Sequence, residues 1–164
     1  TTGRRRSISD VNSPDVMLRR AGLADAAAVK ALTLDAYRKW VAVLGREPLP
    51  MSADYELAVR EHQIDLFERG GHLLGLIELA LQSDHLLIVN VAVAPGAQGN
   101  GYGKLLLAHA ERVARDAGLS ELRLYTSALM TANIKLYERA GYAEFAREQR
   151  APGWLIVHMR KILA

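Results

Sequence analysis

Two hydrophobic patterns follow one another along this chain, a continuous apolar run and then a helical repeat, and they predict a mixture of strands and helices. From Leu86 to Val93 every position except Asn90 is apolar, which is typical of a central strand buried on both faces. Apolar positions then recur at helical spacing from Leu106 to Ala117, which predicts an amphipathic helix. A buried strand therefore runs almost directly into a helix.

The other segments predict a single α/β domain with a mixed sheet. Gly70-Gly71 and Ser83-Asp84 are turns short enough for antiparallel hairpins. Gly22 is an acceptable N-cap, and Asp25 places a carboxylate in the first turn of the helix that follows. Residues 40–50 show neither the hydrophobic pattern of a strand nor that of a helix and are expected to be irregular. The expected strands are 16–20, about 63–68, 72–81, 85–94, 121–126, 143–150 and 154–161, and the expected helices are 26–37, 53–61, 132–140 and one that follows residue 104.

A glycine-rich turn joins the buried strand to its helix within Val89–Lys104. Glycines let successive backbone N–H groups converge on one point, and the positive end of the helix dipole lies behind them. The turn is therefore predicted to bind phosphate or pyrophosphate.

Two common phosphate-binding motifs do not fit this turn. A mononucleotide P-loop fails because Gln98 stands where its first glycine belongs and Leu105 where its Ser/Thr belongs. The dinucleotide motif has a different glycine spacing from the alternate glycines of 99–103. Its acidic residue ends the second strand, whereas Glu121 begins the next strand here.

A third pattern fits the turn and its surroundings. The run 98–103, Gln-Gly-Asn-Gly-Tyr-Gly, resembles the [RQ]-x-x-G-x-[GA] acyl-CoA loop of the GNAT superfamily of N-acetyltransferases. Residues 91–95 resemble that family's fourth strand and the proline that leaves it, and 133–142 resemble its C-terminal N-x-x-[LA]-Y-x-[RK]-x-G-[FY] run. Residues 18–25 resemble its first strand and helix entry, so the resemblance spans roughly 16–161.

The resemblance implies a fold and a domain organisation. It implies a single-domain GNAT fold with a mixed, mostly antiparallel central sheet of six to seven strands flanked by helices. Strands four and five are expected to splay apart at the acyl-CoA site. We expect the domain to occupy residues 15–164, preceded by a flexible tail of residues 1–14.

The resemblance also implies an activity, the transfer of an acetyl group from acetyl-CoA to a primary amine of a small molecule, peptide or protein. The alternative is a non-catalytic acyl-CoA-binding regulatory module. Tyr137 favours the enzyme, whereas Asn90, where some family members have a glutamate, leaves room for the module.

The residues expected to bind acetyl-CoA follow from the matched motifs. Glycines in the loop would let the main chain approach the diphosphate, and polar side chains would add donors at its rim. By resemblance, the backbone around Val91 and Val93 pairs with the pantetheine arm and Asn133 hydrogen-bonds the cofactor. The expected cofactor-binding residues are Val91, Ala92, Val93, Gln98, Gly99, Asn100, Gly101, Tyr102, Gly103, Lys104 and Asn133.

Three side chains are candidates for proton transfer, one as the acid and two as the base. By resemblance, Tyr137 is the acid that protonates the CoA thiolate, and a phenol can do this because a thiolate leaving group is comparably basic. The general base is open: Asn90 cannot accept a proton, Glu78 is the nearest carboxylate by pattern, and His85 could titrate near neutrality. A water chain to solvent would need no dedicated base.

The acceptor site is expected in residues 40–55 and 147–154. Few of these residues are charged, so a small or peptidic amine with some apolar character is expected rather than a polyamine. The expected acceptor-site residues are Trp40, Tyr55 and Asn90, with Arg46, Glu47, Met51 and Trp154 as further candidates.

Composition limits the kinds of chemistry, partner and location that this chain can be expected to have. The 164 residues include no cysteine, which excludes disulfides, thiolate metal sites and a cysteine nucleophile, and we expect no metal. The net charge is +3, with Arg4–Arg6 contributing as much as the whole excess. The arginines lack interleaved aromatics, so we expect neither a nucleic-acid nor a membrane partner. No apolar stretch follows them, which argues against a secretory signal. A cytoplasmic monomer or homodimer is expected.

Overall fold

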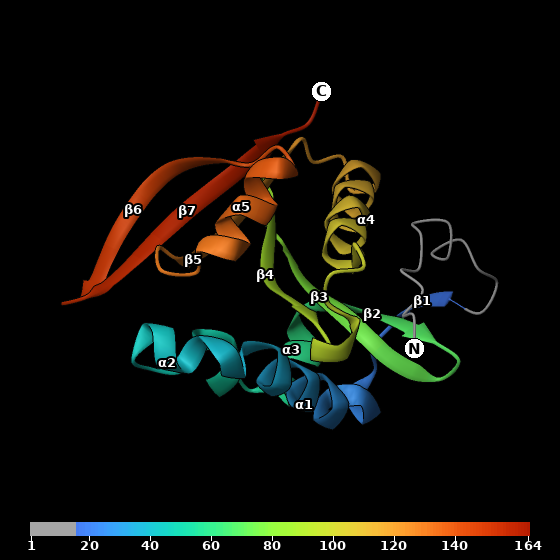
Figure 1. Cartoon of the computed structure of the whole chain (residues 1–164). Coiled ribbons are helices and arrows are strands. Elements are labelled where there is room, and N and C mark those ends of the chain that lie inside the picture. The colour runs from blue at the N-terminus through green and yellow to red at the C-terminus, as the bar shows by residue number, and fades with distance from the viewer. Residues whose placement is uncertain (1–15) are drawn as a thin grey trace.

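A computed structural model describes residues 16–164 of the chain (Figure 1). The expected tail of residues 1–14 and its Arg4–Arg6 cluster lie outside the described part. None of the helices within 16–164 is long and apolar enough to cross a membrane. The elements are β1 (Val16–Arg20), α1 (Ala26–Tyr37), α2 (Val41–Leu44), α3 (Tyr55–Glu61), β2 (Gln63–Arg69), β3 (His72–Leu81), β4 (Leu86–Val93), α4 (Tyr102–Asp116), β5 (Glu121–Ser127), α5 (Thr131–Arg139), β6 (Ala143–Ala151) and β7 (Trp154–Ile162).

The seven strands form one sheet in the order β1-β2-β3-β4-β5-β7-β6. Every neighbouring pair is antiparallel except β4 and β5, which are parallel. A parallel pair needs a crossover connection, and α4 supplies it. The prediction of a mixed, mostly antiparallel sheet is confirmed.

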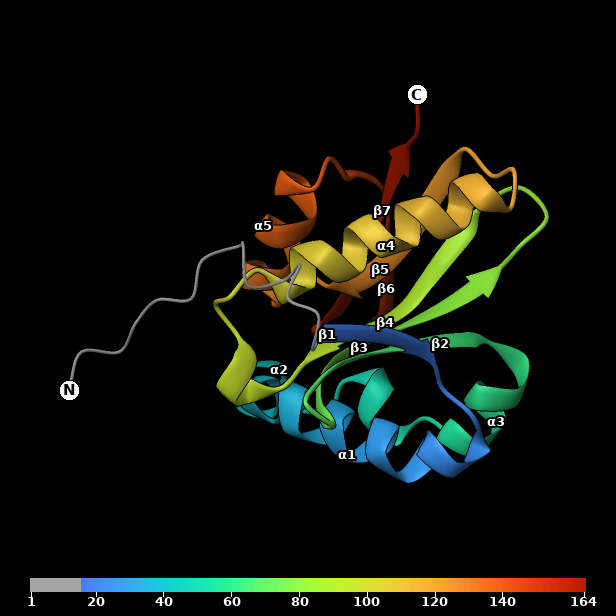
Figure 2. The same ribbon diagram turned by 90° about the vertical axis from the view of Figure 1, so that its right-hand side faces the viewer.

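Helices cover both faces of the sheet (Figure 2). One face packs against α1 and α3 through a core that includes Val29, Leu32 and Tyr55. The opposite face packs against α4 through a second core that includes Leu106 and Ala110, and Tyr137 brings α5 into that core. The sheet therefore separates two apolar layers.

The parallel pair β4–β5 separates part of the way along. Backbone pairing runs only from Leu86↔Leu122 to Ile88↔Leu124. At the same place the register between β3 and β4 shifts, because Glu78 faces Asn90 while Leu79 faces Ile88. The extra residue of this bulge, Val89, turns the rest of β4 away from β5. The expected splay of strands four and five is confirmed.

The expectation that β4 is buried on both faces is wrong. Its residues alternate between buried and partly buried, so the strand is not fully buried on both faces. Leu87, Val89, Val91 and Val93 are only partly covered. The last three of them line cavities, because no β5 backbone accompanies β4 beyond Ile88.

The segment expected to be irregular instead contains short helical turns. Turns of 3-10 helix occupy Arg38–Trp40 and Leu49–Ser52, and α2 lies between them. None spans more than four residues, which is too short for a sustained hydrophobic period to appear in the sequence. The helix expected from residue 53 begins at Tyr55, since Asp54 caps it by accepting a hydrogen bond from the Leu57 N–H at 3.1 Å.

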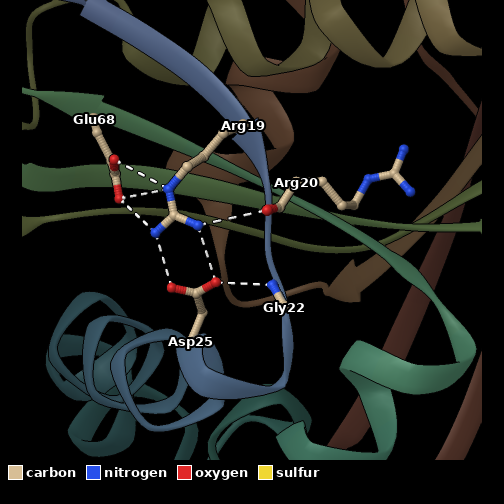
Figure 3. Close-up of polar contacts among 5 residues, drawn as sticks. All are labelled: Arg19, Arg20, Gly22, Asp25 and Glu68. Carbon is tan, nitrogen blue, oxygen red and sulfur yellow. Dashed lines mark hydrogen bonds and ion pairs between the residues drawn. The ribbon is translucent and has the colours of Figure 1, made fainter.

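A cluster of charged side chains ties the start of the domain together (Figure 3). Arg19 on β1 contacts Asp25 at 2.8 Å and Glu68 on β2 at 3.0 Å. Asp25 also accepts from the Gly22 N–H at 2.8 Å, as its position at the helix entry suggested. The Arg19 guanidinium lowers the pKa of the Asp25 carboxyl, so the cluster stays paired at neutral pH.

Candidate active site

Two cavities meet where β4 and β5 separate. The inner cavity lies among α1, β4, β5, β7 and the segment 44–55, and the loop cavity lies between the glycine-rich turn, the end of β4, α5 and residues 36–40. Within residues 16–164, four residues line both cavities: Tyr37, Val91, Asn133 and Tyr137. A molecule bound along the loop cavity can therefore meet one bound in the inner cavity at this junction.

The glycines of the loop have two different physical roles. Gly99 and Gly101 have φ values of +81° and +83°, a region that side chains with a Cβ avoid. Gly101 is also the N-cap of α4, so the free N–H groups of that helix open onto the loop. At Gly103 the reason is close packing, since a Cβ there would lie 3.3 Å from Leu136 Cδ2 on α5.

Polar side chains hold the loop in shape. The Asn100 amide donates to the carbonyls of Ala97 at 2.9 Å and Gln98 at 3.4 Å. The Gln98 amide donates to the Val93 carbonyl at 3.1 Å and accepts from Lys39 Nζ at 2.8 Å. Both were expected as donors at the rim, and in this structure they bond to the protein itself.

Among the described residues, three cations line the loop cavity: Lys39, Lys104 and Arg139. Their charges complement an anionic ligand beside the helix N-terminus. Tyr102 also lines this cavity, but its ring is buried and lies 5.2 Å from the Phe67 ring, so any polar contribution comes from its main chain.

Asn133 and Tyr137 lie one helical turn apart on α5 and both reach the junction. Tyr137 is 7% exposed, and burial raises its pKa to about 12. Its hydroxyl has no hydrogen-bond partner among residues 16–164, so it is free to act on a ligand. The phenol stays protonated at any physiological pH, as an acid must.

Asn90 is engaged by other protein groups. Its side-chain carbonyl accepts from the Tyr37 hydroxyl at 2.9 Å, and its amide donates to Thr33 Oγ1 at 3.2 Å and the Tyr55 hydroxyl at 3.3 Å. Tyr55 in turn donates to the Pro50 carbonyl at 2.6 Å. Asn90 and Tyr55 line the inner cavity, but this network also joins β4 to α1 and α3.

Glu78 also lines the inner cavity, and its position in β3 is directly opposite Asn90 in β4. Its side chain is buried, and Oε2 lies 2.6 Å from His62 Nδ1. His85 is not at the site: it contacts Asp84 in the β3–β4 turn at 2.7 Å and lines neither cavity.

Trp154 forms a wall of the inner cavity. The Arg46 guanidinium lies 4.5 Å from the centre of its ring and the Arg150 guanidinium 5.4 Å. The Arg46 contact joins the 44–55 segment to β7 across the cavity. Trp40, expected near the acceptor, lines the loop cavity instead, next to Lys39.

The residues of the site that were not expected from the sequence include Tyr37, Lys39, His62 and Arg139. Tyr37 occupies a position in the apolar stripe of α1 and reads as core, and the contact of Lys39 depends on tertiary structure. The sequence indicated His62 only indirectly, because the Glu78 carboxylate inside the apolar run Leu76–Ala80 requires a hydrogen-bond partner.

Comparison with known proteins identifies the family. The sequence profile described as "Acetyltransferase (GNAT) family" matches residues 28–142. The chain belongs to this family. A GNAT chain was expected from its loop and α5 motifs, and that prediction is confirmed.

Individual relatives agree with the family assignment. The chain is 33% identical over 75 residues to streptothricin acetyltransferase from Streptomyces lavendulae, and 42% identical over 55 residues to mycothiol acetyltransferase from Pseudarthrobacter chlorophenolicus. These matches cover 44% and 34% of this chain, but only 40% and 17% of the relatives' own lengths. Among solved structures, PaiA N-acetyltransferase from Thermoplasma acidophilum in complex with coenzyme A superposes with a TM-score of 0.74 at 18% identity. That match covers 90% of this chain and 98% of the other, and it shows a shared fold.

Proposed function

We propose that this GNAT chain is an N-acetyltransferase that moves an acetyl group from acetyl-CoA to a primary amine. The observation that carries the proposal is the junction at Tyr137. A proton donor with a free hydroxyl lies where a phosphate-type loop cavity meets a separate inner cavity. Two substrates can therefore approach one acid from opposite sides, as group transfer requires.

In this proposal the loop cavity takes acetyl-CoA. The loop N–H groups around Gly99 and Gly101 bind the diphosphate, supported by the α4 N-terminus and by Lys39 and Lys104. The backbone of residues 91–93 pairs with the pantetheine arm beside Asn133. The residues present fit this ligand because the loop is cationic, glycine-lined and continuous with an open strand edge.

Proton transfer in the inner cavity falls to two side chains. An acceptor enters as an ammonium ion and leaves as an amide, so its nitrogen loses two protons. Glu78 takes the first and frees the lone pair for attack on the thioester carbonyl. Tyr137 gives its proton to the departing sulfur and regains one from the nitrogen, so one proton per turnover must leave through Glu78.

The acceptor we propose is a small or peptidic amine with some apolar character. The inner cavity is lined mainly by apolar and aromatic side chains, and its only charged lining groups among the described residues are Arg46, Glu47 and Glu78. Two carboxylates beside an arginine do not make the strongly acidic trough that a polyamine would need. A clear preference for polyamines in a panel of amines would overturn this acceptor class.

A thiol-release assay tests the activity. Wild-type protein should release CoA from acetyl-CoA only when an acceptor amine is present, and the Tyr137→Phe variant should release it much more slowly. Tight acetyl-CoA binding without acetylation of any amine would instead favour a regulatory module.

A further inference from the structure

A buried carboxylate and a half-buried imidazole form a pair behind the inner cavity. Glu78 is 3% exposed and lies on β3 between Ile77 and Leu79, whose side chains point to the opposite face of the sheet. His62 ends α3, and its side chain is 30% exposed. The pair therefore spans the distance between the cavity and solvent.

The pair fixes the protonation of one nitrogen. An ionised carboxylate can only accept hydrogen bonds, so His62 Nδ1, at 2.6 Å from Oε2, carries the proton and donates it. The other carboxylate oxygen, Oε1, has no hydrogen-bond partner among residues 16–164. Glu78 thus has one oxygen held by His62 and one left for a ligand in the cavity that it lines.

Apart from His62, no side chain within the described residues forms a hydrogen bond or ion pair with Glu78. The groups near it are Tyr37 from α1, Tyr55 from α3 and Asn90 from β4, and all are neutral at neutral pH. Burial raises the pKa of Tyr37 and raises that of Tyr55 to about 12, and the Glu78 charge adds to both shifts. Arg46 and Glu47 line the same cavity but form no ion pair with Glu78. The His62 ring is therefore the group that holds the Glu78 carboxylate in place.

We propose that His62 is a positioning residue that holds Glu78 Oε2 and so orients Oε1 toward the acceptor. This inference rests on the proposed acetyl transfer. In each turnover the ammonium N–H bond breaks and the proton moves to Glu78 Oε1. The Glu78 carboxyl group then releases the proton to solvent water, while His62 Nδ1 keeps its own proton and continues to donate it to Oε2.

Four variants separate this role from simple packing. His62→Ala should lower kcat roughly tenfold or more with unchanged acetyl-CoA affinity, and His62→Asn should recover part of the loss because its amide N–H can donate in place of Nδ1. Glu78→Gln should lose at least as much as His62→Ala. The matched control is His72→Ala, because His72 is exposed on the same strand as Glu78 and lines neither cavity.

The pH–rate profile and the double variant give the decisive readouts. Loss of a donor disfavours the ionised carboxylate, so the acidic limb of kcat/KM should move to higher pH in His62→Ala. Adding His62→Ala to Glu78→Gln should lower kcat no further, since His62 acts only through the Glu78 carboxylate. An unchanged profile, or fully additive losses, would overturn the inference while leaving acetyl transfer intact.

A spectroscopic arm does not depend on turnover. The His62 ring N–H should give a protected proton resonance in the wild-type protein, assigned by its loss in His62→Ala, and it should disappear in Glu78→Ala. A resonance that is absent, or that persists in Glu78→Ala, would overturn the pairing alone. A wild-type protein that acetylates no amine would overturn both the function and the role of His62 in it.

Discussion

Gly101 and Gly118 lie at opposite ends of α4 in the same left-handed backbone conformation, with φ values of +83° and +73°. A Cβ at either position would meet no atom within 4 Å. Both positions therefore require the same left-handed backbone conformation, but only Gly101 lines the loop cavity. They form a natural pair for separating backbone strain from ligand binding.

Gly101→Val is expected to abolish acetyl-CoA binding, whereas Gly118→Val is expected to preserve it. A β-branched residue in the left-handed region costs roughly 1–3 kcal/mol of folding free energy at either site. Only at position 101 does the side chain also project where the diphosphate would approach. Calorimetric titration with CoA, alongside circular dichroism, measures both effects. Normal binding by Gly101→Val would remove the phosphate assignment.

Tyr137→Phe is expected to lower turnover by roughly 10- to 10,000-fold, the scale of general acid catalysis. Acetyl-CoA affinity should change little, because the hydroxyl acts mainly in the transition state. The phenyl ring preserves the contact with the Tyr142 ring at 6.2 Å, so folding should be unaffected. Steady-state kinetics and a binding titration distinguish the two parameters, and wild-type turnover would assign Tyr137 to packing.

Trp154→Ala and Trp40→Ala are expected to affect different substrates. Trp154 lines the inner cavity beneath Arg46, so its loss should raise the KM for the acceptor. Trp40 lines the loop cavity, so its loss should weaken acetyl-CoA binding. Measuring both constants in both variants tests the assignment of the cavities, and a reversed pattern would exchange them.

Stability is expected to fall above pH 10. Burial raises the pKa of Tyr37, Tyr55, Tyr137 and Tyr142 above the unfolded value of 10, so the folded state holds protons that the unfolded state releases. Between pH 10 and its folded pKa, each tyrosine lowers the free energy of unfolding by about 1.4 kcal/mol per pH unit. Below pH 10 the contribution is fully present.

Tyr142→Phe provides a test of that slope. The buried Tyr142 hydroxyl has no hydrogen-bond partner among the described residues, so its removal should not destabilise the protein at pH 8. Urea unfolding at pH 8, 10 and 11 should show a shallower decline in the variant. An equally steep decline would mean that Tyr142 does not contribute to the alkaline loss.

Periodicity predicted most of the elements but not the geometry that opens the site. The apolar run of β4 and the helical repeat of α4 are local patterns, so the sequence located these elements within a few residues. The bulge at Val89 depends on the register of β3 against β4, which no local pattern encodes. The sequence therefore placed the splay only by family resemblance.

The same distinction applies to the site. The glycines of the loop are recognisable because their spacing is local, and the motif on α5 indicated Tyr137. The partner of Glu78 could not be read from the chain, since His62 is sixteen residues away and looks like an ordinary helix end. Both tryptophans suggested an acceptor wall, and only tertiary packing assigned them to separate cavities.

The most direct test of acetyl transfer is to incubate the wild-type protein with acetyl-CoA and a panel of amines, following free thiol and product mass together. The panel should span amino acids, peptide N-termini, lysine peptides, aryl amines and polyamines. We predict that at least one small or peptidic amine with apolar character gains a single acetyl group, with one thiol released per product. Acetyl-CoA that binds tightly while every amine remains unmodified would contradict the account.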